Sequence, residues 1–210
     1  MEVIIKNYAD DWQIIKDNAL FTVHKFGGGQ YPSPAWKRRI LLAEHSPIRS
    51  GRLIIEVHDI PTYVIGHIVR HSVGFLPFVA TLRSDRTEYA DGKVPDRNTL
   101  NSVRFEGNYQ AFINISRKRL CGQASEKTRE FWSAVMAAVA ECVPELYFVC
   151  VPECVYRGGC PEFNMCLDKI WTNFYSDLLS KGQLERAFLT LPKRYEEWHR
   201  FKNERSDFEN

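Results

Sequence analysis

Arginines gathered in two places are the residues of this chain whose types and spacing best suit chemistry. The first place is residues 70–72, Arg-His-Ser, followed by Thr81 and Arg83. The second is residues 117–129, which contains Arg119 and ends in a further arginine. A guanidinium group binds carboxylates and phosphates through two parallel hydrogen bonds. Two such clusters in a chain of formal net charge +2 indicate a local binding site for an anion.

The first cluster follows a predicted helix. Pro61 suits the first turn of a helix, and apolar residues recur at helical spacing from there to Val69. Arg70 and His71 are therefore expected at the end of a mostly buried helix. For Arg70 taken alone, an internal ion pair with an aspartate or glutamate is a simpler alternative, because buried charges are usually paired.

Arg70 and His71 also resemble a motif of the flavin-dependent thymidylate synthases. That family carries Arg-His-Arg, seven residues, and then Ser-x-Arg, on a helix followed by a loop. In this chain Ser72 stands in the third place, and residues 81–83, Thr-Leu-Arg, match Ser-x-Arg if one residue is inserted.

The flanking segments extend the resemblance over roughly residues 40–143. Before the helix the family has a His/Glu-x-Ser/Thr-Pro turn and an apolar strand, and this chain has Ser46 within His-Ser-Pro, followed by an apolar run at residues 53–57. After the helix, Asn114 and Arg119 fall in the family's places without a gap. The chain is thus similar to a divergent member of this family.

The resemblance implies an α+β domain, with a mixed sheet flanked by helices and a long core helix beginning near Ala124. It also implies a homotetramer that holds each flavin between subunits. The implied reaction methylates a pyrimidine deoxynucleotide monophosphate, dUMP to dTMP, with FAD as cofactor, NADPH as reductant and methylene tetrahydrofolate as carbon donor. By position, His67, Arg83 and Arg119 would bind the nucleotide, and Thr81 and Arg119 would act in catalysis. The flavin contacts would come from Ser46, Arg70, His71 and Asn114.

Three positions depart from the family pattern. Ser72 replaces an arginine that helps to hold the flavin, which removes about 1.5 to 3 kcal/mol per charge-assisted hydrogen bond. His67 stands where the family often has a nucleotide-binding glutamine, and Thr81 stands in place of the serine beside the pyrimidine. Two alternatives therefore stay open: a related flavin enzyme acting on another pyrimidine nucleotide, and a catalytically silent homologue that only binds.

Cysteines form a further candidate site. Four of them follow a Cys-x3-Cys-x5-Cys-x5-Cys pattern, close enough for four thiolates to reach one tetrahedral zinc ion: Cys150, Cys154, Cys160 and Cys166. The pattern lacks the Cys-x2-Cys pairs of well-defined zinc sites, so buried free thiols are the alternative. A metal-stabilised nucleic-acid module is the corresponding alternative function.

The predicted elements place these residues around a core. Residues 126–142 are the clearest helix, because large apolar side chains recur along one face. A polar loop is expected over residues 84–101, and a polar tail from about residue 203. Strands are expected at residues 3–7 and 53–57, helices at 10–20, 34–44 and 167–179, and a helical or extended run at 108–116.

Composition bounds the remaining possibilities. With 210 residues, of which 44% are hydrophobic and 13% aromatic, the chain can bury one sizeable core, so residues 1–210 are predicted to form a single domain. The small net charge argues against a protein that coats nucleic acid. The N-terminal segment contains acidic residues and no long apolar run, which favours a cytoplasmic protein without a membrane span.

Overall fold

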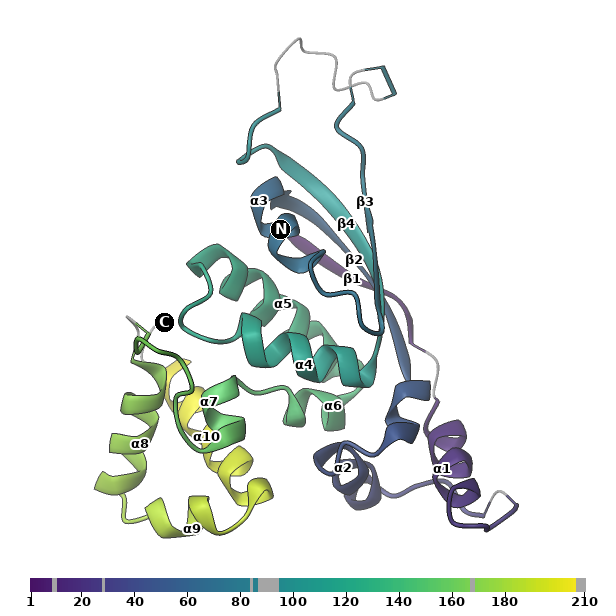
Figure 1. The fold of residues 1–210 in the computed structure, drawn as a ribbon, viewed down its shortest axis with the longest axis vertical. Coiled ribbons are helices and arrows are strands. Elements are labelled where there is room, and N and C mark those ends of the chain that lie inside the picture. Colours follow the sequence, from purple (N-terminus) through teal and green to yellow (C-terminus); the bar gives the residue numbers. More distant parts are fainter. Residues whose placement is uncertain (9–10, 28, 84, 87–94, 167–168, 207–210) are drawn as a thin grey trace.

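The computed structural model describes residues 1–8, 11–27, 29–83, 85–86, 95–166 and 169–206 (Figure 1). Its strands are β1 (Glu2–Tyr8), β2 (Arg52–Pro61), β3 (Phe75–Val79) and β4 (Leu100–Asn108). Its helices are α1 (Trp12–Phe21), α2 (Pro34–Leu42), α3 (Thr62–Ile68), α4 (Tyr109–Arg119), α5 (Glu126–Cys142), α6 (Pro144–Val149), α7 (Glu153–Arg157), α8 (Ile170–Ser180), α9 (Leu184–Leu189) and α10 (Leu191–Ser206), together with the short 3-10 helix η1 (Ser46–Ser50).

The strands form one sheet in the order β1-β2-β4-β3. Every pairing in the described sheet is antiparallel, whereas a mixed sheet was predicted. The α+β class itself is confirmed. Strand β3 lies at an edge, which is where a strand tolerates Pro77 because no ladder hydrogen bond is lost on the open side.

One face of the sheet packs on the helices. Along β2, Leu53, Ile55 and Val57 are buried while the side chains between them are more exposed, as the two-residue period of a strand requires. Helices α4 and α5 lie on this buried side, and the C-terminal helices α8–α10 lie farther from the sheet (Figure 1).

Helix α5 forms the centre of the core, as the sequence predicted. Its stripe of Phe131, Trp132, Val135, Met136 and Val139 is buried. The Trp132 ring stacks on Phe112 of α4, with 5.9 Å between the ring centroids. Helix α4 thus packs against both α5 and the sheet, where Phe112 also contacts Phe105 of β4, and its C-terminal end carries Arg119.

Two local features determine how the chain enters β3 and α4. Gly74 has φ of +70°, a left-handed conformation that glycine adopts without steric cost, and its carbonyl accepts a hydrogen bond from the Asn108 amide at 2.9 Å. Asn108 then caps α4, because its Oδ1 accepts from the Ala111 amide at 2.9 Å. The turn that follows α3 and the start of α4 are thus held together.

Several predicted boundaries change. The run predicted at 108–116 is helical, as α4, and begins at Tyr109. Strand β4 begins at Leu100, inside the predicted polar loop, of which residues 84 and 87–94 lie outside the described residues. Helix α10 continues to Ser206, into the predicted polar tail, and residues 207–210 again lie outside the described part. None of the helices in the described segments is both long and apolar enough to cross a membrane.

Candidate functional site

A contact between the two arginine clusters forms the centre of the site. Nε of Arg119, in the last turn of α4, donates a hydrogen bond to Nε2 of His71 at 3.0 Å. His71 lies in the turn between α3 and β3, so the contact joins segments 48 residues apart. Both side chains are partly buried. The sequence prediction that these two segments converge on one site is consistent with this contact.

His71 is neutral at physiological pH. Burial, followed by the charge of Arg119, lowers the pKa of His71 to about 4. The hydrogen bond agrees with this state, because a nitrogen that accepts from a guanidinium cannot itself carry a proton, and the ring proton must then be on Nδ1. His71 therefore adds no positive charge beside Arg119.

Two more arginines add positive charge here. Burial and the charge of Arg70 lower the pKa of Arg119. Burial, followed by the charges of Arg119, Arg70 and Arg97, lowers the pKa of His67. Arg97 lies with its guanidinium carbon 5.0 Å from the centre of the Tyr63 ring. We call Arg70, Arg97 and Arg119 the arginine cluster.

The arginine cluster has no carboxylate partner among the residues that the structure describes. None of its three members takes part in an ion pair there, and the pKa of Arg119 is shifted down rather than up. Arg119 is half-buried beside the like charge of Arg70, and such a charge is unfavourable unless an anion neutralises it. The arginine cluster is therefore a candidate anion-binding site.

Arg117, two residues earlier, has the opposite environment. Its guanidinium forms an ion pair with Glu44, and its guanidinium carbon lies 3.5 Å from the centre of the Tyr156 ring. The side chain of Arg117 is only 11% exposed. Arg119 is half-buried, so of these two arginines Arg117 is the one that enters the core.

His67 is held by the start of α5. Its Nδ1 lies 2.8 Å from Oγ1 of Thr128, which in turn lies 2.7 Å from Oγ of Ser125. Because one end of the ring is held in this way, the orientation of His67 towards the arginine cluster is fixed by side chains of another element.

The remaining predicted residues lie in two other places. Thr81 and Arg83 follow the far end of β3 and are exposed, and Arg83 is paired with Asp85 through contacts of 3.0 and 2.6 Å. At about 3.3 Å per strand residue, β3 alone separates them from His71 by roughly 15 Å. Within one chain they do not join the arginine cluster.

Ser46 and Asn114 lie together around Glu44. Ser46 begins η1 and is exposed. Asn114 is exposed on α4, where its Oδ1 accepts from Gln110 at 3.2 Å, and Gln110 also donates to Glu44 at 2.7 Å. Five residues along a helix correspond to a rotation of about 140°, so Asn114 does not share a face with Arg119.

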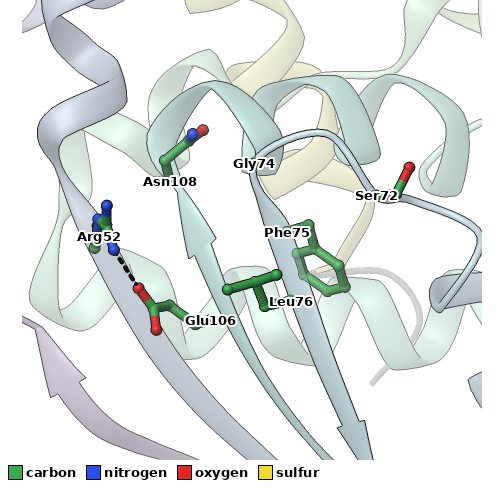
Figure 2. A pocket seen from close by; sticks show the side chains of 7 residues that line it. All are labelled: Arg52, Ser72, Gly74, Phe75, Leu76, Glu106 and Asn108. Carbon is green, nitrogen blue, oxygen red and sulfur yellow. Dashed lines mark hydrogen bonds and ion pairs between the residues drawn. The ribbon is translucent and has the colours of Figure 1, made fainter.

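Ser72 lines a separate pocket beside the site. The pocket has a volume of about 180 Å³ and is also lined by Arg52, Gly74, Phe75, Leu76, Glu106 and Asn108. Figure 2 shows Ser72 at the end of the pocket away from Arg52. Arg52 is bound to Glu106 at 2.7 Å. Ser72 is exposed, and the two charged side chains that line this pocket, Arg52 and Glu106, neutralise each other.

The predicted zinc site does not form as proposed. In the described residues, no group of three or more His, Cys, Asp or Glu side chains is arranged to hold a metal ion. Cys150 is buried against Ser116, and burial raises the pKa of its thiol to about 12. The set of Cys150, Cys154, Cys160 and Cys166 is therefore wrong, since its first member points into the core.

Sequence reasoning missed Arg97, Tyr63 and Thr128. Arg97 falls in the predicted polar loop, where nothing distinguishes it from neighbouring charged residues. Thr128 occupies a buried position at the start of α5 and resembles any core threonine. Only contacts between distant segments identify these residues.

Comparison with solved structures places the fold. The chain is similar to the flavin-dependent thymidylate synthase ThyX from Helicobacter pylori complexed with FAD and dUMP, with a TM-score of 0.59 and 12% identity over 72% of this chain and 100% of the other. It is also similar to a UMP/dUMP methylase, PolB from Streptomyces cacaoi, bound with 5-Br dUMP, with a TM-score of 0.57 and 11% identity over 70% and 93% of the two chains. No family model and no curated protein matches the sequence.

The fold is that of the flavin-dependent thymidylate synthases, so the predicted resemblance is confirmed at this level. Two members of the arginine cluster, Arg70 and Arg119, lie at positions that the sequence motif had picked out, whereas Arg97 does not. At 12% identity the similarity shows the fold alone, so the activity has to be inferred from the residues of the site.

Proposed function

We propose that this chain is a flavin-dependent methyltransferase that acts on a pyrimidine deoxynucleotide monophosphate, converting dUMP to dTMP. One observation carries the proposal: Arg70, Arg97 and Arg119 have no carboxylate partner in the described chain and act on His67, and Arg70, His71 and Arg119 stand at the motif positions. A nucleotide phosphate carries the negative charge that would neutralise these arginines.

In this proposal Arg119 and Arg83 bind the nucleotide, with His67 beside them. A guanidinium directed at the pyrimidine oxygens would also stabilise the negative charge that develops on the ring as its C5 atom becomes nucleophilic. Thr81 would place a hydroxyl near the ring. Because Thr81 and Arg83 lie away from Arg119 in one chain, the proposal requires a homo-oligomer, a tetramer, whose subunits share a site.

The same residues fit a flavin in part. Arg70 supplies positive charge, and His71, neutral, has an Nδ1 proton to donate. Ser46 and Asn114 are exposed polar side chains that a second subunit's site can use. FAD, when bound and reduced by NADPH, would supply the reducing equivalents, and methylene tetrahydrofolate the carbon. The chain's own contribution is positioning and electrostatic stabilisation.

A second acceptor is supported by the similarity to PolB, whose substrates are UMP and dUMP. The altered residues at positions 67, 72 and 81 allow a changed acceptor, so UMP is the alternative substrate.

Turnover tests the proposal. The purified chain is incubated with FAD, NADPH, methylene tetrahydrofolate and either dUMP or UMP, and products are separated by chromatography. Formation of dTMP is expected, and formation of 5-methyl-UMP would assign the alternative acceptor. Flavin binding without either product would identify a silent homologue and contradict the enzyme proposal.

A further inference from the structure

One side of helix α3 faces away from the core and lies beside the arginine cluster. On the core side, Val64, Ile65 and Ile68 are buried. Residues spaced three and four positions apart lie on the other side and are partly or fully exposed: Tyr63, Gly66, His67 and Arg70. Arg70 follows the end of α3 and continues this row, because Val69 keeps a right-handed helical conformation. We call these four residues the α3 face.

Gly66 leaves the middle of the α3 face open. Among the described residues, no heavy atom beyond its chain neighbours and its own helix backbone would lie within 4 Å of a Cβ atom added at Gly66. Glycine weakens a helix, and alanine in such open space would stabilise it. The stability of the fold therefore does not account for a glycine here. Bare helix backbone does, however, allow a flat ring to approach closely.

Tyr63 stands at one end of the α3 face and is held in place. Its ring centre lies 5.9 Å from that of His67, with the two planes at 75°. The guanidinium carbon of Arg97 lies 5.0 Å from the Tyr63 ring centre, and the Tyr63 amide donates to the Arg97 carbonyl at 3.0 Å. The amide and the hydroxyl of Thr62 both donate to the Thr99 carbonyl, at 3.0 and 2.8 Å. The segment that carries Arg97 is thus fixed to the start of α3 through its backbone.

Positive charge lies at both ends of the α3 face. Arg97 is at the Tyr63 end, and Arg70 is about 10 Å farther along the helix at 1.5 Å per residue. Arg119 adds its charge at the Arg70 end, where it acts on the guanidinium of Arg119 and Arg70 mutually. This arrangement suits a nucleoside monophosphate, because its flat base can cover Gly66 while its phosphate pairs with a guanidinium.

We propose that the pyrimidine ring of the nucleotide lies on the α3 face, with the ring against Gly66, its edge towards Tyr63 and the phosphate at the Arg70 end. The inference rests on the proposed function, because it places the base of that nucleotide beside the arginines that bind its phosphate. Gly66 acts as a specificity-determining residue, since any side chain there lifts the ring away from the helix. Neither Gly66 nor Tyr63 belongs to the motif from which the site was predicted.

Gly66→Ala separates this role from a structural one. The substitution should raise the melting temperature by about 1 to 3 °C, because alanine favours a helix. It should weaken the binding of dUMP about tenfold, because the added methyl group takes up space that the ring needs. Gly66→Leu adds a larger side chain that also favours a helix and should weaken binding further. Thermal melts and calorimetric titration measure the two properties.

Gly159→Ala is the matched control and should leave the affinity for dUMP unchanged. A Cβ atom at Gly159 also has open space among the described residues, its backbone is not left-handed, and it lies after α7. Deoxyuridine supplies a second comparison. Gly66→Ala should weaken the binding of deoxyuridine and of dUMP by the same factor, because the contact is with the ring.

Three outcomes overturn the inference. The first is an unchanged affinity for dUMP in both Gly66 variants. The second is a loss of affinity for FAD without a loss for dUMP, which would place the flavin on the α3 face. The third is a lower melting temperature together with weaker binding, which would show a structural role. In each case turnover of dUMP by the wild-type chain still supports the proposed function, whereas a wild-type chain that binds no dUMP overturns both.

Discussion

Arg117 and Arg119 stand two residues apart on α4 and have opposite environments. Two residues along a helix correspond to a rotation of about 200°, so the side chains leave opposite faces. Arg117 enters the core and pairs with Glu44, and Tyr156 covers its guanidinium. Arg119 meets a neutral histidine and the repulsion of Arg70.

The difference separates a charge that is neutralised within the chain from one that has no carboxylate partner among the described residues. The chain neutralises Arg117 internally, so that arginine stabilises the fold and is unavailable to a ligand. No described carboxylate neutralises the arginine cluster, so its charge is left for a partner from solution. Substitution of the two arginines should therefore have contrasting effects on stability and on binding.

The largest expected effect is on stability. Arg117→Met should lower the free energy of unfolding by about 3 kcal/mol, because it leaves Glu44 partly buried without its ion-pair partner. Arg119→Met should change it by less than about 1 kcal/mol, because the charge it removes is repelled by its neighbour. Urea unfolding followed by circular dichroism measures both. Equal losses of unfolding free energy in the two variants would show that the two arginines do not differ in their contribution to stability.

For ligand binding we expect the opposite: substitution of Arg119 should have the larger effect. Arg119→Ala should weaken the binding of dUMP by about tenfold to a hundredfold, corresponding to one charge-assisted hydrogen bond or slightly more, and should affect deoxyuridine much less. Lys118→Ala, on the same helix but exposed, is the matched control. Calorimetric titration gives the affinities. Equal weakening of the binding of dUMP and of deoxyuridine would show that Arg119 does not bind the phosphate.

An arginine at position 72, where the family pattern has one, should strengthen the binding of FAD. Ser72→Arg is expected to tighten FAD binding about tenfold, equivalent to about 1.4 kcal/mol, because the pocket beside Ser72 offers room for the longer side chain. Ser72→Met adds comparable length without charge and should leave the affinity unchanged. Flavin fluorescence during titration of the apo-protein measures both variants. A gain shared by the methionine variant would assign the effect to packing instead of charge.

A further expected effect is a pH dependence carried by His71. Its pKa falls from the usual 6.5 to about 4 in the folded chain, so the unfolded chain binds this proton first as the pH decreases. His71 therefore contributes a loss of stability between about pH 6.5 and pH 4. His71→Asn should make the decline shallower over that window.

His24→Asn is the control for that measurement, because His24 is exposed and asparagine tolerates its left-handed backbone conformation. Thermal melts at a series of pH values give the two slopes. Identical slopes in the His71 variant and the wild type would show that His71 does not titrate as its burial requires.

Strong periodicity made part of the fold predictable. Residues 126–142 matched α5 because seventeen consecutive residues keep one apolar face. Strand β3 was missed because Pro77 lies within it, and proline argues against a strand except at an edge. Strand β4 was missed because only Val103 and Phe105 supply large apolar side chains to its buried face.

The site was predictable where a motif carried it. Arg70, His71 and Arg119 were proposed as site residues because their order and spacing resemble a family pattern, and the structure brings His71 and Arg119 into contact. Arg97 joins them through folding alone. The cysteines show the same limit, since chain spacing grouped Cys150 with three other thiols, whereas the fold buries Cys150 in the core.

The visible spectrum of the flavin-loaded protein tests the central claim most directly, because bound oxidised flavin absorbs where no side chain does. The account predicts a flavin that stays with the protein through gel filtration and a spectrum that shifts when dUMP is added, with a much smaller shift for deoxyuridine and none for dUMP in Arg119→Ala. A folded protein that retains no FAD at micromolar concentrations, and whose spectrum does not change when dUMP is added, would contradict the account. The similarity to the flavin-dependent thymidylate synthases would then be restricted to the fold.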